Sequence, residues 1–127
     1  MKVLNIVDTA YRATLEEQDD TIVWITAAMR TNASAPVDLL LRGNAVNYAV
    51  RSQDASGLTF GDQRQTQPPQ LAKDLEKLKE KGARILVVRD ALRERGIEDD
   101  ELIPGMEFVG RDALAKLFGE YDQVWHW

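Results

Sequence analysis

The chain has 127 residues and a formal net charge of −5, and its hydrophobic and charged contents of 44% and 29% are ordinary for a globular domain. It contains no cysteine and one histidine, His126, which excludes disulfides, thiolate nucleophiles, persulfide carriage and metal sites built from cysteines or several histidines. The acidic balance, the lack of a long apolar run and the lack of a signal-peptide pattern predict a cytoplasmic protein that binds neither nucleic acid nor a membrane.

The first part of the chain predicts two strands and two helices. Val3–Val7 and Val37–Leu41 are short, mostly apolar runs of the kind that form buried strands. Residues 15–30 predict a helix, because acidic side chains come early in it and an arginine ends it, which complements the helix dipole. Its expected buried face, with three- and four-residue spacing, consists of Ile22, Ile25 and Met29. Residues 45–51 predict a second, short helix.

Residues 52–70 are the least patterned part of the chain and are rich in Gln, Asp, Ser and Gly. We predict a long loop here, with a brief apolar contact at Leu58-Thr59-Phe60. Loops of this length are usually functional or disordered. This one is a candidate either for contact with another subunit or for a lid over the strand ends.

The second part of the chain continues the alternation. Pro68-Pro69 can begin a helix, since proline is tolerated in the first turn, and Gly82 is placed to end it in a left-handed conformation. The apolar stripe of this helix consists of Leu71, Leu75 and Leu78. Three further strands are predicted at residues 83–88, 106–109 and 124–127. Two short helices separate them, with Asp90 and Asp112 as expected N-caps.

Regular alternation of strands and helices predicts a parallel sheet with helices on both faces. The expected fold class is therefore α/β, a three-layer α/β/α arrangement around a mainly parallel five-stranded sheet. No internal repeat and no boundary interrupts the pattern, so residues 1–127 are expected to form a single domain.

Polar side chains follow the predicted strands, at the edge where a parallel sheet places its carboxyl ends and where ligands bind. The candidate ligand-binding residues are Asp8, Arg12, Arg42, Asn44, Arg89 and Asp90. Arginines beside helix N-termini could hold phosphate, sulfate or a carboxylate. The alternative is that Asp90 only caps its helix and that the arginines pair with neighbouring carboxylates. No glycine-rich phosphate loop and no calcium-loop spacing occur, so we predict no metal and no cofactor.

Aromatic residues gather near the end of the sequence, at Tyr121, Trp125 and Trp127. Alternation along a strand points Trp125 and Trp127 to the same side. We expect Trp125 to complete the core, whereas Trp127 is harder to bury so near the end. Because indoles are enriched at protein interfaces, we predict a subunit contact at or near Trp127.

Four segments resemble the DsrE/DsrF-like family in their order and spacing. They are Leu39-Leu40-Leu41-Arg42-Gly43-Asn44-Ala45-Val46, Gly82-Ala83-Arg84-Ile85-Leu86-Val87-Val88, Leu92-Arg93-Glu94-Arg95-Gly96-Ile97 and Leu102-Ile103-Pro104-Gly105-Met106-Glu107-Phe108-Val109-Gly110. The resemblance implies a small α/β protein that assembles into homo- or hetero-oligomers, such as trimers or hexamers. Several members of the family pass a persulfide between proteins in sulfur relay. Their cysteines fall at positions occupied here by Val88 and Ala91, which cannot carry sulfur.

The leading hypothesis is a non-catalytic homo-oligomer that binds a partner protein or a small anionic ligand in the crevice at the strand ends. The alternative is a sulfur-relay component whose thiol comes from another subunit. A third hypothesis is a small-molecule sensor in which Arg42 and Arg89 hold an anion. The question of an enzyme stays open at this point; the lack of a cysteine nucleophile argues against one, and a Ser-His-Asp triad would depend on His126.

Overall fold

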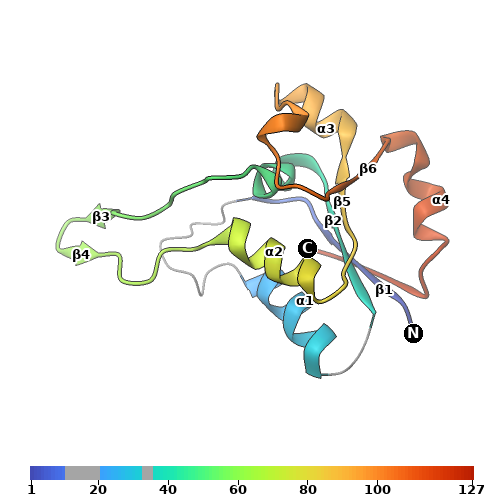
Figure 1. Cartoon of the computed structure of the whole chain (residues 1–127), viewed down its shortest axis with the longest axis horizontal. Coiled ribbons are helices and arrows are strands. Elements are labelled where there is room, and N and C mark those ends of the chain that lie inside the picture. Colours follow the sequence, from blue (N-terminus) through green and yellow to red (C-terminus); the bar gives the residue numbers. More distant parts are fainter. Residues whose placement is uncertain (11–20, 33–35) are drawn as a thin grey trace.

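The computed structural model describes residues 1–10, 21–32 and 36–127, and its main sheet has five strands (Figure 1). The strand order is β6-β5-β2-β1-β7, and every neighbouring pair is parallel. The strands are β1 (Val3–Val7), β2 (Val37–Leu41), β5 (Ile85–Val88), β6 (Glu107–Val109) and β7 (Gln123–His126). The predicted five-stranded parallel sheet is confirmed.

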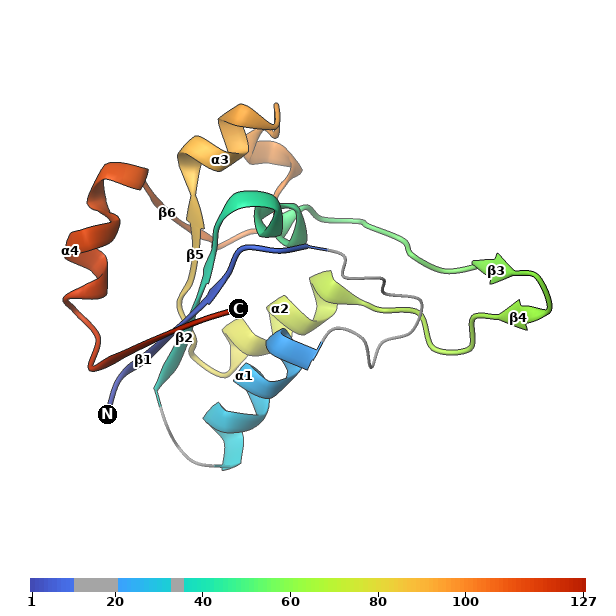
Figure 2. The same cartoon turned by 180° about the vertical axis from the view of Figure 1, so that it is seen from behind.

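Helices lie on both sides of this sheet. Helices α1 (Thr21–Asn32) and α2 (Leu71–Glu80) lie on one side of the strands, and α4 (Leu114–Phe118) lies on the other side in both views (Figure 1 and Figure 2). Helix α3 (Arg89–Glu94) follows β5 directly, at the carboxyl ends of the strands. Within the described ranges, no helix combines the length and the apolarity that a membrane crossing requires.

Strands β1, β2 and β5 are buried along their whole length, as central parallel strands covered on both faces should be. Alternate side chains point to opposite faces of the sheet. Asn5 faces α1, where its Nδ2 donates to Thr26 Oγ1 at 2.8 Å. Asp38 accepts a hydrogen bond from the hydroxyl of Tyr121, which follows α4, at 2.8 Å. Burial and the carboxylate of Asp38 together raise the pKa of Tyr121 above its ordinary value.

Helix α1 buries a different face from the one predicted. Val23 and Thr26 are buried, whereas Ile25 is 41% exposed. The stripe expected to face the core, formed by Ile22, Ile25 and Met29, is only half-buried or exposed. Thr26 turns toward the sheet because the buried amide of Asn5 needs a polar partner there. The first residues of the predicted helix lie outside the described ranges.

Residues Gly43–Ala49 form a 3-10 helix, η2, which begins and ends two residues earlier than the short helix predicted at 45–51. Gly43 has a φ of +55°, and a Cβ on it would lie 3.2 Å from the backbone oxygen of Asp8. The N–H of Ala45 donates to the same oxygen at 3.2 Å. The end of β1 therefore presses closely on the start of η2, and glycine permits both the contact and the left-handed backbone.

Between η2 and α2, residues 51–70 form what we call the arm, an extended segment that projects away from the sheet (Figure 1 and Figure 2). Its outer part is an antiparallel hairpin of β3 (Thr59–Phe60) and β4 (Gln63–Arg64). The prediction of a loop without regular structure was therefore wrong at this point. Leu58 and Phe60, expected to make an apolar contact, are 40% and 64% exposed.

Helix α2 buries its predicted stripe, and Gly82 follows it with a φ of +83°. The helix begins at Leu71 with Gln70 as its N-cap, so the prediction that Pro68-Pro69 form its first turn was wrong. The two short helices begin differently from the prediction. Helix α3 begins directly after Val88, which places Asp90 in its first turn instead of at the N-cap. Asp112 lies inside a 3-10 turn, η4 (Arg111–Ala113), that precedes α4. Both predicted N-caps were therefore wrong by one or two positions.

Candidate functional site

The carboxyl ends of β1, β2 and β7 bring three polar side chains together. Asp8 follows β1, Arg42 follows β2, and His126 ends β7, where it pairs with Ile6 of β1. Arg42 donates two hydrogen bonds to Asp8, from Nε to Oδ1 at 2.6 Å and from Nη2 to Oδ2 at 2.8 Å. His126 Nε2 contacts the same Oδ2 and lies 3.4 Å from Arg42 Nη2. We call these three residues the Asp8–Arg42–His126 cluster.

Opposite charges hold Asp8 and Arg42 together within the cluster. The hydrogen bond from Arg42 holds the pKa of Asp8 below its usual value, with a further contribution from His126, although partial burial opposes the effect. The same pair raises the pKa of Arg42. Asp8 and Arg42 therefore both stay charged at neutral pH. The side chain of His126 is 56% exposed, which leaves it open to a partner or ligand from solvent.

His126 is the member of this cluster that sequence reasoning missed. It lies 118 positions from Asp8 in the chain, and no motif links the two. The available hint was that His126 is the only histidine in the chain and lies near the end of a predicted strand. Only the parallel pairing of β7 with β1 brings it to Asp8, and sequence pattern does not reveal which strands become neighbours.

Two of the other predicted residues form separate pairs. Asn44 Oδ1 accepts two hydrogen bonds from Arg95, at 2.8 and 3.2 Å. Arg89 donates to both carboxylate oxygens of Asp99, at 3.0 and 3.1 Å. The guanidinium of Arg89 also stacks on the ring of Phe108 at 3.9 Å. Arg89 is thus held toward β6 and away from the Asp8–Arg42–His126 cluster.

Asp90 accepts a hydrogen bond from the backbone N–H of Arg111 at 2.7 Å, which lowers the pKa of its carboxyl. It therefore links the starts of α3 and η4. Arg12 lies outside the described residues. Among the described members of the predicted set, Asp8 and Arg42 are the pair joined by hydrogen bonds. The reason is the strand order, in which β2 separates β1 from β5.

The junction between β5 and α3 is filled with apolar side chains. Val88 and Ala91, the positions at which the family resemblance places reactive cysteines, are both fully buried. They belong to the main hydrophobic core. In this chain the junction therefore supplies packing and offers no reactive group.

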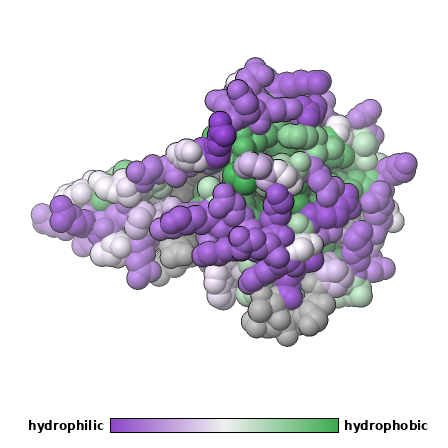
Figure 3. All heavy atoms as spheres, in the orientation of Figure 1, coloured by the Kyte–Doolittle hydropathy of each residue, from purple (hydrophilic) through white to green (hydrophobic). Residues whose placement is uncertain are grey.

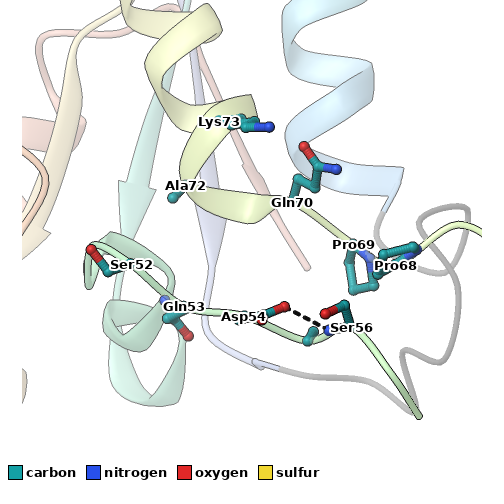
Figure 4. A pocket seen from close by; sticks show the side chains of 10 residues that line it. Ser52, Gln53, Asp54, Ser56, Pro68, Pro69, Gln70, Ala72 and Lys73 are labelled. Carbon is teal, nitrogen blue, oxygen red and sulfur yellow. Dashed lines mark hydrogen bonds between the residues drawn. The ribbon is translucent and has the colours of Figure 1, made fainter.

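A cavity of about 420 Å³ lies where the two limbs of the arm meet the start of α2 (Figure 4). Its lining includes Asp54 and Ser56 on one limb, Pro68 and Pro69 on the other, and Lys73 on α2. The backbone N–H of Ser56 donates to Asp54 Oδ1 at 2.9 Å, and hydrogen bonds from Ser56 lower the pKa of Asp54. None of the lining residues is aromatic, so the cavity lacks the aromatic walls that many small-molecule sites have.

Large apolar side chains are exposed on two elements, helix α1 and the region of the edge strand β7. Trp24, Ile25 and Trp127 are 64%, 41% and 48% exposed, and Trp125 is half-buried. Trp127 Nε1 donates to Asn5 Oδ1 at 3.4 Å, which places this indole on the same face of the sheet as α1. We call these four hydrophobic residues the α1–β7 patch. The prediction that Trp125 completes the core was wrong, because β7 is an edge strand.

Most of the surface seen in Figure 3 is hydrophilic, and a hydrophobic area lies between α3 and α2. Strand β6 contributes Phe108 to this part of the molecule, and Phe108 is 39% exposed beneath Arg89. Among the residues that the structure describes, no three His, Asp or Glu side chains are grouped as a metal site would require. The described surface thus offers charges, hydrogen bonds and exposed indoles.

Comparison with solved structures finds the same fold in other proteins. The crystal structure of the ychN protein from E. coli gives a TM-score of 0.76 at 20% identity, over 100% of this chain and 99% of that one. A protein of unknown function, MTH1491 from Methanobacterium thermoautotrophicum, gives 0.60 at 16% identity over 96% of both chains. A conserved protein of unknown function, BT1422 from Bacteroides thetaiotaomicron, gives 0.67 at 11% identity over 99% and 95%.

Sequence comparison gives the family. A search of curated proteins finds no match. The model of the DsrE/DsrF-like family, however, matches residues 1–126, nearly the whole chain. The resemblance noted in the four sequence segments is therefore confirmed, and the chain belongs to the DsrE/DsrF-like family.

Proposed function

We propose that this chain is a cytoplasmic, non-catalytic DsrE/DsrF-like subunit that forms homo-oligomers and binds a partner protein at the edge where the strands end. The family is associated with sulfur relay, whose transfer step requires a thiolate. This chain contains no cysteine, and Val88 and Ala91 are buried at the positions concerned. What the chain can contribute is therefore binding.

The exposed indoles of the α1–β7 patch are the observation that carries the proposal. Large apolar side chains that stand in water are costly, and tryptophan is enriched among the residues that dominate interface energies. Trp127 lies at the strand-end edge itself, since its backbone oxygen accepts the N–H of Asp8 at 3.3 Å. Trp127 therefore adjoins the Asp8–Arg42–His126 cluster, whose charges would orient a partner.

The same geometry supports a protein partner better than a small anion. Asp8 already occupies two N–H donors of Arg42 and offsets its positive charge, which weakens the attraction of this guanidinium for an anion. An anion on Arg89 would compete with Asp99. The anion hypothesis keeps a direct test, because bound sulfate or phosphate would raise the melting temperature. Arg42→Ala should abolish such a shift, and the absence of any shift in the wild type would remove the hypothesis.

Light scattering coupled to size-exclusion chromatography tests the proposed assembly. We expect the wild type to elute with a mass above that of the monomer. Trp127→Ala should weaken association by about 2 kcal/mol, roughly 30-fold in Kd, because an interface indole is lost. Lys116→Ala, an exposed change on α4, is the matched control and should leave the mass unchanged. A wild type that stays monomeric over a wide concentration range would contradict the proposal.

The alternative role, a relay component whose thiol comes from another subunit, rests on the family association. Both roles require that this chain itself takes up no sulfur. Intact-mass spectrometry after incubation with a persulfide donor should therefore show an unmodified chain. A stable sulfur adduct would overturn the non-catalytic assignment.

A further inference from the structure

His126 is the side chain through which this protein can respond to pH near neutrality. The chain contains one histidine and no cysteine, and histidine is the side chain that ordinarily changes its charge between pH 5 and 8. Hydrogen bonds move other acidic groups away from that range, because they lower the pKa of Asp8, Asp54 and Asp90. Among the described side chains, a change of charge near neutral pH therefore falls on the Asp8–Arg42–His126 cluster.

The contacts of the imidazole lie on one of its two nitrogens. Nε2 of His126 contacts Asp8 Oδ2, just past the end of β1, and lies 3.4 Å from Arg42 Nη2, just past the end of β2. Within the described part of the chain, η2, α3, α4 and the rest of β7 bring no further charged group into contact with the ring. Nδ1 makes no hydrogen bond to any described residue, and the side chain is 56% exposed. The ring is thus held at Nε2 and open at Nδ1.

The neighbours of Nε2 decide where the neutral ring carries its hydrogen. A guanidinium only donates hydrogen bonds, and a carboxylate only accepts them. Arg42 donates to both oxygens of Asp8, which keeps this carboxylate charged. Nε2 of His126 therefore carries the hydrogen and directs it to Asp8 Oδ2. In this form Nδ1 presents a lone pair to solvent, so the open side of the ring does not attract an anion.

Protonation reverses the polarity of this open side. The added proton goes to Nδ1, since Nε2 already carries one, and both nitrogens then donate. Asp8 and Arg42 offset each other, so the charged ring of His126 gives the cluster one net positive charge. The Nδ1–H group then offers a charge-assisted hydrogen bond to an incoming carboxylate. A carboxylate bound there leaves the hydrogen bonds between Asp8 and Arg42 intact.

We propose that protonated His126 is a docking point for a carboxylate of the partner protein, so that the strand-end edge binds an acidic segment more tightly as the pH falls below neutral. The inference rests on the proposed function for a partner at this edge, and it adds the chemistry of that partner and the control of its binding by pH. The charges are complementary, and the exposed ring leaves room for the second one.

Binding of a polyglutamate peptide, which carries a dye with pH-independent emission, tests the docking point. Glutamate stays ionised between about pH 6 and about pH 8, so a change in affinity over this range reports on the protein. We expect the wild type to bind about threefold more tightly at the lower pH, as an exposed ion pair allows. A polyglutamine peptide with the same dye should show no such preference.

Two substitutions fix the charge at the docking point. His126→Gln is neutral at every pH and should bind polyglutamate as weakly as the wild type does at about pH 8. His126→Lys stays positive over the range and should bind as tightly as the wild type does at about pH 6. Lys116→Gln, which removes an exposed positive charge on α4, is the matched control and should keep the wild-type dependence on pH. Circular dichroism checks that each variant is folded.

Proton NMR gives a second measurement on the unchanged protein, because a single histidine gives a single imidazole C2–H signal. A ligand that prefers the charged ring must move the titration midpoint of this signal to higher pH, by linkage. We expect added polyglutamate to raise the midpoint by at least about 0.3 pH units, which corresponds to an about twofold preference for the charged ring. Polyglutamine should leave the midpoint unchanged.

The outcomes separate the docking point from the function it rests on. Tighter binding of polyglutamate in acid that is lost in His126→Gln and kept in Lys116→Gln supports the docking point. Absent binding, equal binding at both pH values, or a pH dependence that survives His126→Gln overturns it. None of these results changes the mass found by light scattering, and a monomeric wild type contradicts the proposed assembly without changing the peptide result.

Discussion

Single polar residues interrupt the apolar pattern of the buried strands in this chain. The central strand β1 is apolar except for Asn5, which is only 1% exposed. Its amide donates to Thr26 Oγ1, and its oxygen accepts a hydrogen bond from Trp127. One buried side chain thus connects the sheet to α1 and to the last residue of the chain. Buried polar groups are tolerated only when they are paired in this way.

Thr26→Val should destabilise the protein by about 1–3 kcal/mol, because it removes the hydrogen-bond acceptor of a buried amide. Thr26→Ser, which keeps the hydroxyl, is the control and should cost less. Urea unfolding followed by circular dichroism measures both. Equal stability of Thr26→Val and the wild type would show that the Asn5–Thr26 hydrogen bond does not stabilise the fold.

The lowered pKa of Asp8 leads us to expect a loss of stability in acid. Its folded pKa is depressed below 3.8, chiefly by the hydrogen bond from Arg42. A depressed carboxyl pKa contributes stability that is fully present above the unfolded pKa and is lost as pH falls through the folded pKa. Asp8→Asn should therefore be less stable than the wild type at neutral pH.

The difference between Asp8→Asn and the wild type should begin to shrink as the pH falls below 3.8, where the carboxyl of the unfolded chain takes up a proton, and it should vanish once the folded carboxyl, with its lower pKa, is protonated too. Unfolding free energies of both proteins across this range check the prediction. A difference that is constant with pH would mean that the side chain of Asp8 acts by shape and not by charge.

At the scale of elements, periodicity predicted which segments are helices and strands, and neighbours decided how each is turned. Helix α2 buries its predicted leucine stripe, because its pattern is unambiguous. Helix α1 is apolar on most sides, so its pattern allows several orientations. The buried amide of Asn5 selects the one in which Thr26 faces the sheet.

Gly43 lies at the boundary between β2 and η2, and we expect a substitution there to be costly. Its φ of +55° disfavours a side chain, and so does the backbone oxygen of Asp8, which would lie 3.2 Å from an added Cβ. Gly43→Ala should destabilise the protein by about 1–3 kcal/mol. Gly57→Ala is a matched control, because Gly57 also has a positive φ but has no atom within 4 Å of the place that a Cβ would take.

The Gly57→Ala control separates the cost of the close contact at Gly43 from the cost of the left-handed backbone. Gly57→Ala should cost about 1 kcal/mol for the left-handed backbone alone. Thermal unfolding of the two variants beside the wild type measures the difference between them. Equal costs at the two positions would indicate that the approach of β1 to η2 adds nothing.

At the scale of the whole molecule, the order β6-β5-β2-β1-β7 places the first and last strands of the sequence side by side. This pairing creates the Asp8–Arg42–His126 cluster and leaves β7 as an edge with exposed indoles. The arm projects away from the same body (Figure 2). Trp127 stays exposed beside this edge, and its indole is the basis of the assembly proposed above.

The sequence by itself determined the class of fold, because short apolar runs that alternate with amphipathic helices can be buried in few ways other than a covered parallel sheet. It also determined the family, from the order of four segments, and excluded thiol chemistry, because cysteine is absent. These conclusions depend on local pattern and composition, which every stretch of chain carries with it.

Only the tertiary structure decided the site. It joined His126 to Asp8 and Arg42 across 118 positions, held Arg89 apart on Asp99, and left Trp125 at an edge. Periodicity shows that a side of an element is apolar, but it does not show which element will lie against that side. Pairing between distant strands is set by the packing of the whole chain, and for that reason the charged cluster and the exposed indoles could be located only in the folded molecule.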